Sequence, residues 1–123
     1  MIQESGEMYL ETILVLSKSS NNVRAIDISE YMSYSKPSVS RALGVLRSGG
    51  YIEIAPGGAV ELTDAGRKIA ENIYEKHLVL TDVLMRLGVD EKTATEDACK
   101  IEHAISDTSF EALKKILHLN GEA

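Results

Sequence analysis

Apolar residues recur at helical spacing in two stretches near the start of the chain. Residues 5–17 place apolar side chains mostly three or four positions apart, and Ser5 is a possible N-cap. The polar run at 17–22 then interrupts the pattern, as a loop does. Residues 25–32 predict a second, shorter helix. Its inward-facing residues are expected to be Ile26, Ile28 or Ser29, and Met32.

A third helix and a hairpin follow. Pro37 is well placed in the first turn of this helix, and the glycine pair 49–50 is suited to a left-handed cap at its end. Residues 51–54 and 59–62 alternate like half-buried strands around a turn at 55–58. Helix, turn, helix and hairpin is the order of a winged helix-turn-helix. The core side of the third helix is predicted to be Val39, Ala42, Leu43 and Leu46.

The rest of the chain is predicted to be helical. Thr63 is a suitable N-cap for a long helix, and Gly88 is suited to close it. The fold class is therefore mainly α, with a winged helix-turn-helix domain over residues 1–63 and a helical domain over residues 64–123. The three helices of the second domain are predicted from Thr63 to Leu87, from Asp90 to Ala104, and from Ser106 or Asp107 to about Leu119.

Composition is that of an ordinary globular protein. The chain has 123 residues, of which 44% are hydrophobic and 26% charged. No apolar run approaches the roughly 20 residues that a membrane helix needs, and the polar N-terminus lacks the features of an export signal. We therefore expect a cytoplasmic protein. Cys99 is the only cysteine, so it cannot form an internal disulfide.

Charge is unevenly distributed along the chain. The formal net charge is −6, and residues 69–123 account for −5 of it. Residues 36–47, in contrast, contain three basic residues and no acidic one. A basic stripe within an acidic protein favours a DNA-contacting module joined to a metal-binding or oligomerising module.

The helix that follows residue 34 has the side chains of a recognition helix, because small polar groups and donors gather at its N-terminus. Pro37 and Val39 are candidates for contacts with thymine methyl groups, and the hairpin tip could approach phosphates or the minor groove. A merely solvated amphipathic helix is the alternative, but the following glycine pair and hairpin favour DNA binding. A single copy makes few phosphate contacts, which favours a dimer on a two-part operator. The predicted DNA-binding residues are Ser35, Lys36, Pro37, Ser38, Ser40, Arg41, Arg47 and Gly57.

Candidate metal ligands fall on three predicted helices. Cys99, Glu102 and His103 share one helix face at positions i, i+3 and i+4, so a thiolate, a carboxylate and an imidazole can converge. Such a mixed set suits a first-row transition ion such as Fe²⁺ better than Mg²⁺ or Ca²⁺. A lone cysteine, or a methionine on an apolar face, is also common in an ordinary core. The other candidate ligands are Met8, Glu11 and His77.

Four stretches together resemble a known family: residues 7–11 (EMYLE), 36–41 (KPSVSR), 62–67 (LTDAGR) and 97–107 (DACKIEHAISD). They are similar to the iron- and manganese-dependent repressors of the DtxR/MntR family, over essentially the whole chain. The stretch at 97–107 is the most specific of the four. The resemblance implies a cytoplasmic homodimer that binds operator DNA when loaded with Fe²⁺ or Mn²⁺ and represses metal-uptake or iron-economy genes.

The resemblance also implies roles for the candidate ligands. Iron-type members carry one metal site where this chain has Met8, Cys99, Glu102 and His103, and manganese-type members use further ligands where it has Glu11 and His77. The manganese type is expected to carry carboxylates at the two sulfur positions, so the sulfur ligands favour iron, although Ni²⁺, Co²⁺ or Zn²⁺ can substitute in vitro.

Two features depart from the longer family members. The ancillary metal site of iron-type members would need an acid and a histidine near Thr81 and Thr95, so we expect that site to be incomplete. The chain also ends at Ala123, without their SH3-like domain. We therefore expect control through two modules only.

The resulting hypothesis is a switch in which a metal ion fixes the angle between the two domains and so the spacing of two recognition helices. Three alternatives remain open at this point. One is a redox sensor based on the Cys99 thiolate, another is a small metal-dependent hydrolase, and the third is a winged scaffold for protein interactions. We expect the protein not to be an enzyme.

Overall fold

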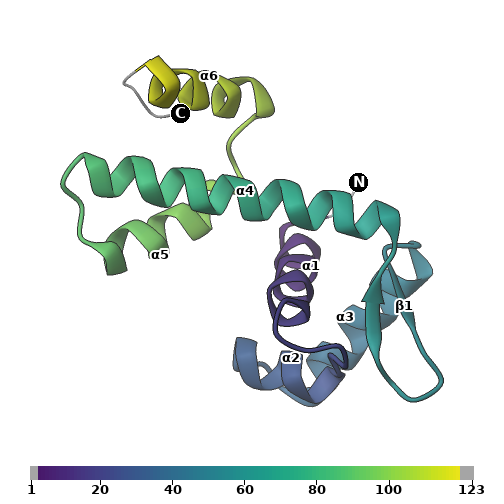
Figure 1. The fold of residues 1–123 in the computed structure, drawn as a ribbon. Helices are drawn as coiled ribbons and strands as arrows, with labels where there is room; N and C mark the ends of the chain where they lie inside the picture. Colours follow the sequence, from purple (N-terminus) through teal and green to yellow (C-terminus); the bar gives the residue numbers. More distant parts are fainter. Residues whose placement is uncertain (1–2, 120–123) are drawn as a thin grey trace. The chain divides into compact units, whose positions relative to one another are not determined.

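The computed structural model describes residues 3–119, with side chains described as far as residue 117 (Figure 1). The chain divides into two compact units, residues 1–72 and 73–123, and one long helix, α4 (Asp64–Arg86), continues from the first into the second. The mainly α fold class with a small two-stranded wing is confirmed.

The first unit has the element order expected of a winged helix-turn-helix. Its two strands pair antiparallel, with Ile52 opposite Leu62 and Ile54 opposite Val60. The tip of the hairpin is closed by a hydrogen bond from the Gly58 amide to the Ala55 carbonyl at 2.8 Å. Besides the start of α4, its elements are α1 (Glu4–Ser17), α2 (Ala25–Met32), α3 (Lys36–Ser48), β1 (Ile52–Ile54) and β2 (Val60–Leu62).

Aliphatic side chains from all of these elements form one core in the first unit. Figure 1 shows α1, α2 and α3 gathered beside the hairpin, and helices and strands in such an arrangement bury one face each. The inward side of α3 agrees with the predicted pattern, although Ala42 is only half-buried. The buried aliphatic residues include Leu10, Ile13, Ile28, Val39, Leu43, Leu46, Ile52 and Val60.

Two glycines and a threonine set the boundaries of α3 and α4 as predicted. Gly50 adopts a φ of 84° two residues after the end of α3, and Gly88 a φ of 101° two residues after the end of α4. A Cβ atom is unfavourable in this region. The Thr63 hydroxyl accepts a hydrogen bond from the Gly66 amide at 3.2 Å and donates one to the Gly50 carbonyl at 2.7 Å. Thr63 therefore caps α4 and also ties its start to the end of α3.

Two predicted details of the first unit are wrong. Ser5 does not cap α1, which begins at Glu4 after Gln3. Two glutamates in the first turn of α1 stabilise that end electrostatically without a serine cap. Ile26 is 40% exposed instead of inward. Because it lies about 200° around the helix from the buried Ile28, both residues cannot face the core.

The second unit consists of the C-terminal part of α4, α5 (Glu91–Ile101) and α6 (Asp107–Leu119). Phe110 is its largest fully buried side chain. The helix predicted to reach Ala104 ends at Ile101, and the chain then turns, with the Ala104 amide bonded to the Ile101 carbonyl at 2.9 Å. The Ser106 hydroxyl accepts a hydrogen bond from the Ser109 amide at 3.1 Å and so caps the next helix.

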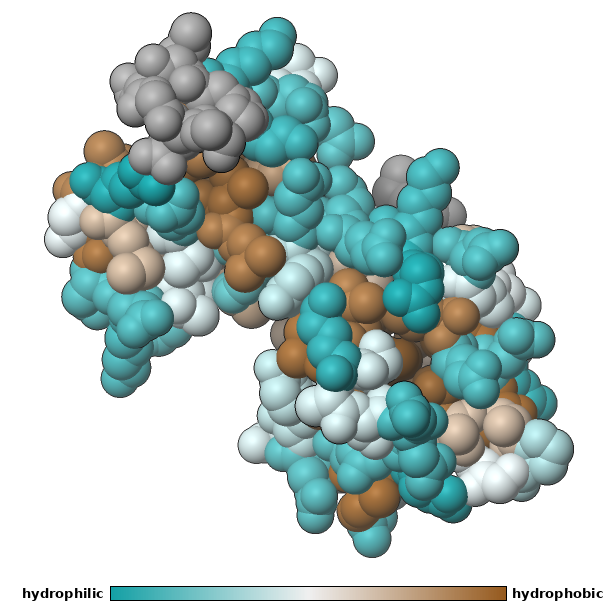
Figure 2. Space-filling view, viewed as in Figure 1, coloured by the Kyte–Doolittle hydropathy of each residue, from teal (hydrophilic) through white to brown (hydrophobic). Residues whose placement is uncertain are grey.

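Hydrophilic side chains cover most of the face shown in Figure 2, and hydrophobic ones also reach the surface. In the second unit, the exposed large hydrophobic residues among those described are Leu78, Met85, Leu87 and Ile116. None of the helices within residues 3–119 is long and apolar enough to cross a membrane.

Candidate functional site

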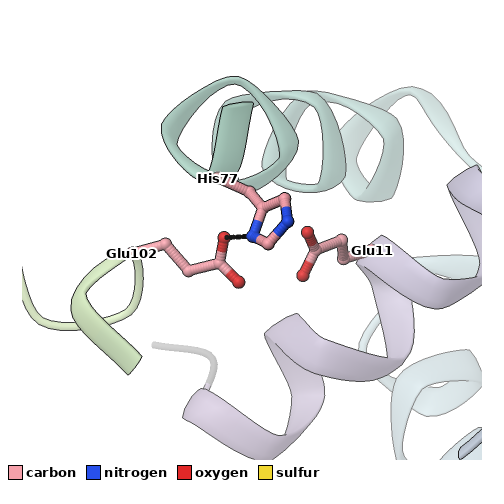
Figure 3. A group of neighbouring side chains, drawn as sticks. All are labelled: Glu11, His77 and Glu102. Carbon is pink, nitrogen blue, oxygen red and sulfur yellow. Dashed lines mark ion pairs between the residues drawn. The ribbon is translucent and has the colours of Figure 1, made fainter. Parts of the chain in front are cut away.

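His77 and Glu102 form the centre of the candidate metal site in the second unit. Nδ1 of His77 on α4 lies 3.3 Å from Oε2 of Glu102, which follows the last residue of α5 (Figure 3). The Glu102 side chain is fully buried, whereas that of His77 is 22% exposed. The site therefore combines a shielded carboxylate with an imidazole that keeps some contact with solvent.

His103 adds a second imidazole to the same carboxylate. Its Nε2 atom lies 3.7 Å from Oε1 of Glu102, and its side chain is 1% exposed. Glu102 thus has a histidine near each of its oxygens. A buried carboxylate is costly unless charges or strong donors compensate it. A divalent cation bound beside the Glu102 carboxylate would provide that compensation.

The chemistry of the donors fits a transition metal. Nδ1 of His77 is buried without a well-aligned hydrogen bond, although the Glu102 carboxylate lies nearby. A ring nitrogen and a carboxylate oxygen at this separation can both coordinate one metal ion. Cys99 lies about one turn before Glu102 on α5, and its side chain is half-buried. Together these side chains offer nitrogen, oxygen and sulfur, the set that first-row divalent ions bind.

The six predicted ligands are divided between the two units. Met8 and Glu11 lie on α1 of the first unit, three residues apart and both half-buried. Figure 3 also draws Glu11. The predicted single helix face is corrected in one respect, because α5 ends at Ile101. Glu102 is therefore the C-cap residue and His103 lies in the following turn. The other four ligands lie in the second unit: His77, Cys99, Glu102 and His103.

The start of α3 presents the predicted DNA-binding residues to solvent. Ser35 caps this helix, since its hydroxyl accepts a hydrogen bond from the Ser38 amide at 3.3 Å. Arg41 extends from the next turn, with a guanidinium nitrogen 3.5 Å from the Ser38 hydroxyl. Ser38 is half-buried. The remaining predicted residues are all exposed, namely Ser35, Lys36, Pro37, Ser40, Arg41, Arg47 and Gly57.

One predicted DNA contact is wrong. Val39 is fully buried, because it points into the core of the first unit, so it cannot reach a thymine methyl group. On the same helix, Val45 is 72% exposed. Helical spacing explains the difference, since these two residues point in directions about 120° apart around the helix axis.

A groove beside α3 contains two residues that the sequence reasoning missed. This cavity of about 720 Å³ includes Arg24 and Gly44 in its lining, together with the predicted Ser40 and Arg47. The Arg24 guanidinium lies against Gly58 in the hairpin loop, where a Cβ atom would be 2.8 Å from it. A basic residue directly before a predicted helix was the available signal for Arg24. The sequence contains no comparable signal for Gly44, because the place of this residue in the groove depends on the fold. The other lining residues are Ala25, Ile26, Leu43, Ser48, Ile54, Gly58 and Val60.

An aromatic pair connects α1 to the start of α3. The ring centroids of Tyr9 and Tyr34 are 6.0 Å apart, and the Ser29 hydroxyl donates a hydrogen bond to the Tyr34 carbonyl at 2.6 Å. The pKa of Tyr9 is raised, mainly because the side chain is buried, so its hydroxyl remains protonated. The helix that carries Met8 and Glu11 is thereby packed against the loop that leads into α3.

Comparison with known proteins identifies both parts of the chain. Residues 1–60 match the family model of the iron dependent repressor N-terminal DNA binding domain, and residues 63–119 match that of the iron dependent repressor metal binding and dimerisation domain. The chain belongs to this repressor family. The resemblance seen in the sequence is therefore confirmed.

Individual relatives agree with the family assignment. The transcriptional regulator MntR of Escherichia coli O157:H7 is 31% identical over 113 residues, covering 92% of this chain and 73% of that protein. The diphtheria toxin repressor of Corynebacterium diphtheriae is 30% identical over 118 residues, covering 93% of this chain and 51% of the repressor. The structure of the manganese regulator SloR is 31% identical with a TM-score of 0.83, covering 92% of this chain and 53% of that one. The chain thus spans about half the length of the latter two.

Proposed function

We propose that the protein is a DNA-binding transcriptional repressor of metal-homeostasis genes, activated by Fe²⁺ or Mn²⁺. The observation that carries this proposal is the buried carboxylate of Glu102 beside His77 and His103. These residues lie within the match to the metal binding and dimerisation domain, and the basic helix α3 lies within the match to the DNA binding domain. We assign these roles to residues 64–123 and 1–63 respectively.

The proposed ligands come from both units. His77, Cys99, Glu102 and His103 would hold the ion from the second unit, and we assign the remaining positions to Met8 and Glu11 on α1. When bound, the divalent ion supplies positive charge that stabilises the carboxylates and the thiolate beside the neutral imidazole and thioether donors. Because α1 packs against the loop before α3 through Tyr9 and Tyr34, holding α1 would also hold the DNA-reading end of α3.

We propose iron as the preferred metal, with manganese as the alternative. Thioether and thiolate donors from Met8 and Cys99 are softer than carboxylates, and softer donors favour Fe²⁺ over Mn²⁺. Ni²⁺, Co²⁺ and Zn²⁺ would also bind in vitro, since affinity at such sites generally follows the order of the divalent series.

The proposed partners are operator DNA and a second copy of the chain. The exposed apolar residues of the second unit, including Leu78 and Ile116, are suited to a homodimer interface. A dimer would present two α3 helices to successive major grooves, which lie about 34 Å apart on one face of the duplex. The family consists of transcriptional repressors, and we propose a regulator of this kind, acting in the cytoplasm, and not an enzyme.

Fluorescence anisotropy with labelled promoter DNA tests this function. Protein purified without oxygen is titrated into DNA with Fe²⁺, with Mn²⁺, or with a chelator. The proposal predicts tight binding only with metal, and loss of the metal effect in Glu102→Gln. DNA binding that does not depend on metal but is reversed by peroxide would instead support a redox sensor based on Cys99. Absence of DNA binding under all conditions would contradict the repressor function.

A further inference from the structure

We propose that Lys76 is a positioning residue that holds the turn carrying two metal ligands in its binding geometry. This inference rests on the proposed metal-dependent function. The turn, residues 102–106, joins α5 to α6 and begins with Glu102 and His103. Lys76 lies on α4 directly before His77, so one segment of α4 supplies both a proposed ligand and the group that fixes the turn with Glu102 and His103.

Lys76 is unusual because it is a buried lysine. It is only 6% exposed, although lysine is almost never buried unless it is paired. Its ammonium group lies 3.1 Å from Oδ1 of Asp107 and 3.5 Å from the carbonyl oxygen of Ile105. Ile105 lies near the end of the turn, and Asp107 is the first residue of α6. The ammonium group therefore fixes the C-terminal end of the turn to α4.

The other end of the turn is fixed by the backbone of α5. The Glu102 amide donates to the Ala98 carbonyl, and the Ile105 amide donates to the Ile101 carbonyl, both at 2.9 Å. Glu102 and His103 are thus held between two anchored points, a helix end on one side and the Lys76 ammonium on the other. Outer-shell groups that orient metal ligands commonly change metal affinity by about 10–100-fold when they are removed, and Lys76 would act in this way through the backbone of the turn.

Lys114 provides a matched control. Its ammonium group joins α6 to α4 through Glu75, at 3.2 Å, and also pairs with Glu111 at 3.2 Å. Like Lys76, it therefore connects these two helices by an ion pair. It differs in that neither of these carboxylates belongs to the turn at 102–106. Replacing it removes a charge and a bridge between helices without releasing the ligands.

The test measures Co²⁺ binding to the full chain under anaerobic conditions, by titration and by the visible absorption spectrum of the bound ion. Lys76→Met is expected to bind Co²⁺ about 10–100-fold more weakly than the natural chain, with an altered spectrum. Lys114→Met is expected to change neither, and Lys76→Arg, which keeps the charge and donors, is expected to restore most of the affinity. Thermal unfolding of each metal-free variant reports whether it folds.

Asp107→Asn serves as the second variant if Lys76→Met does not fold, because the Asp107 side chain is 81% exposed and its replacement leaves no cavity. It is expected to weaken Co²⁺ binding in the same direction. Affinities and spectra for Lys76→Met or Asp107→Asn equal to those of Lys114→Met would overturn the role of Lys76, while leaving the proposed function intact. Failure of the natural chain to bind Co²⁺ would overturn the proposed function together with this inference.

Discussion

Two glycines within helices of the first unit have opposite surroundings. Gly66, in the first turn of α4, is buried, and a Cβ atom there would overlap the carbonyl oxygen of Tyr51. Gly44, midway along α3, is exposed and has open space where a Cβ atom would lie. The glycine of the LTDAGR stretch is therefore required by packing, because α4 approaches the backbone of Tyr51, the residue before β1.

The same substitution should consequently have opposite effects at these two positions. Gly66→Ala is expected to lower the free energy of unfolding by about 1–3 kcal/mol, because the backbone of Tyr51 must move. Gly44→Ala is expected to raise it by about 1 kcal/mol, because alanine is the better helix former and meets no neighbour. Chemical denaturation of the metal-free protein measures both values. Equal shifts of the same sign would show that helix propensity alone decides.

Asp90 gives a pH-dependent contribution at the start of α5. Its carboxylate accepts a hydrogen bond from the Thr93 amide at 3.0 Å, and this bond is the main cause that lowers the pKa of Asp90 below 3.8. A lowered pKa in the folded state stabilises the protein above pH 3.8, and this stabilisation is lost as the pH falls through the folded-state value. Asp90→Ala should therefore be less stable than the natural chain above pH 3.8, and the difference should shrink in more acidic solution.

Denaturation at several pH values measures that difference, with Asp90→Asn as the control. Asparagine remains a good N-cap but does not titrate. The stability difference between Asp90→Asn and Asp90→Ala should thus be nearly independent of pH. A difference between the natural chain and Asp90→Ala that stays constant on both sides of pH 3.8 would contradict the assigned role of the carboxylate.

At the scale of elements, the groove beside α3 predicts a backbone contact by Arg24. Its guanidinium lies between the start of α2 and the hairpin, and Arg47 lines the same groove. Arg24→Gln is expected to weaken operator and non-operator DNA binding to a similar degree. It should also reduce the dependence of log affinity on log salt concentration by about one, as expected for a lost phosphate contact.

Arg67→Gln is the matched control for this measurement. Arg67 is also an exposed arginine of the first unit, but it lies on α4 outside the groove and pairs with Glu71 at 3.9 Å. Its replacement removes the same charge and should leave the salt dependence unchanged. If both variants gave the same slope in anisotropy titrations, the groove would have no specific role in binding phosphates.

The elements were largely predictable where local chemistry decides them. Alternation and turn residues predicted the hairpin, while Thr63 and Gly50 marked the ends of neighbouring helices through capping and a positive φ. The end of α5 was not predictable, because no glycine or proline follows Ile101. Ser106 or Asp107 was predicted to start the next helix, but the tertiary contacts of the turn, such as the bond from Lys76 to the Ile105 carbonyl, are not visible in a helical repeat.

The same limit applies to the candidate site. Helical spacing grouped Glu102 with His103, but the pairing of Glu102 with His77 joins residues far apart in the sequence and requires the packing of α4 and α5. Lys76 was missed because its burial depends on the same packing. Local patterns thus predicted candidate ligands, and the fold showed that Glu102 lies beside His77 and His103.

At the scale of the whole molecule, the chain consists of two units to which we assign separate tasks. The first carries the basic helix α3, and the second carries the buried carboxylate with its two histidines. The central claim is that metal binding in the second unit and DNA binding by the first are one coupled equilibrium. Such coupling is reciprocal, and it typically amounts to about 5–150-fold in affinity.

Metal affinity measured by calorimetry in the presence and absence of operator DNA tests this claim most directly. The free energies must close a cycle, so operator DNA should tighten Mn²⁺ or Fe²⁺ binding by the same factor by which the metal tightens operator binding. A matched DNA duplex without the operator sequence provides the control. The account predicts equal factors well above one. A metal affinity that is the same with and without operator DNA would contradict it.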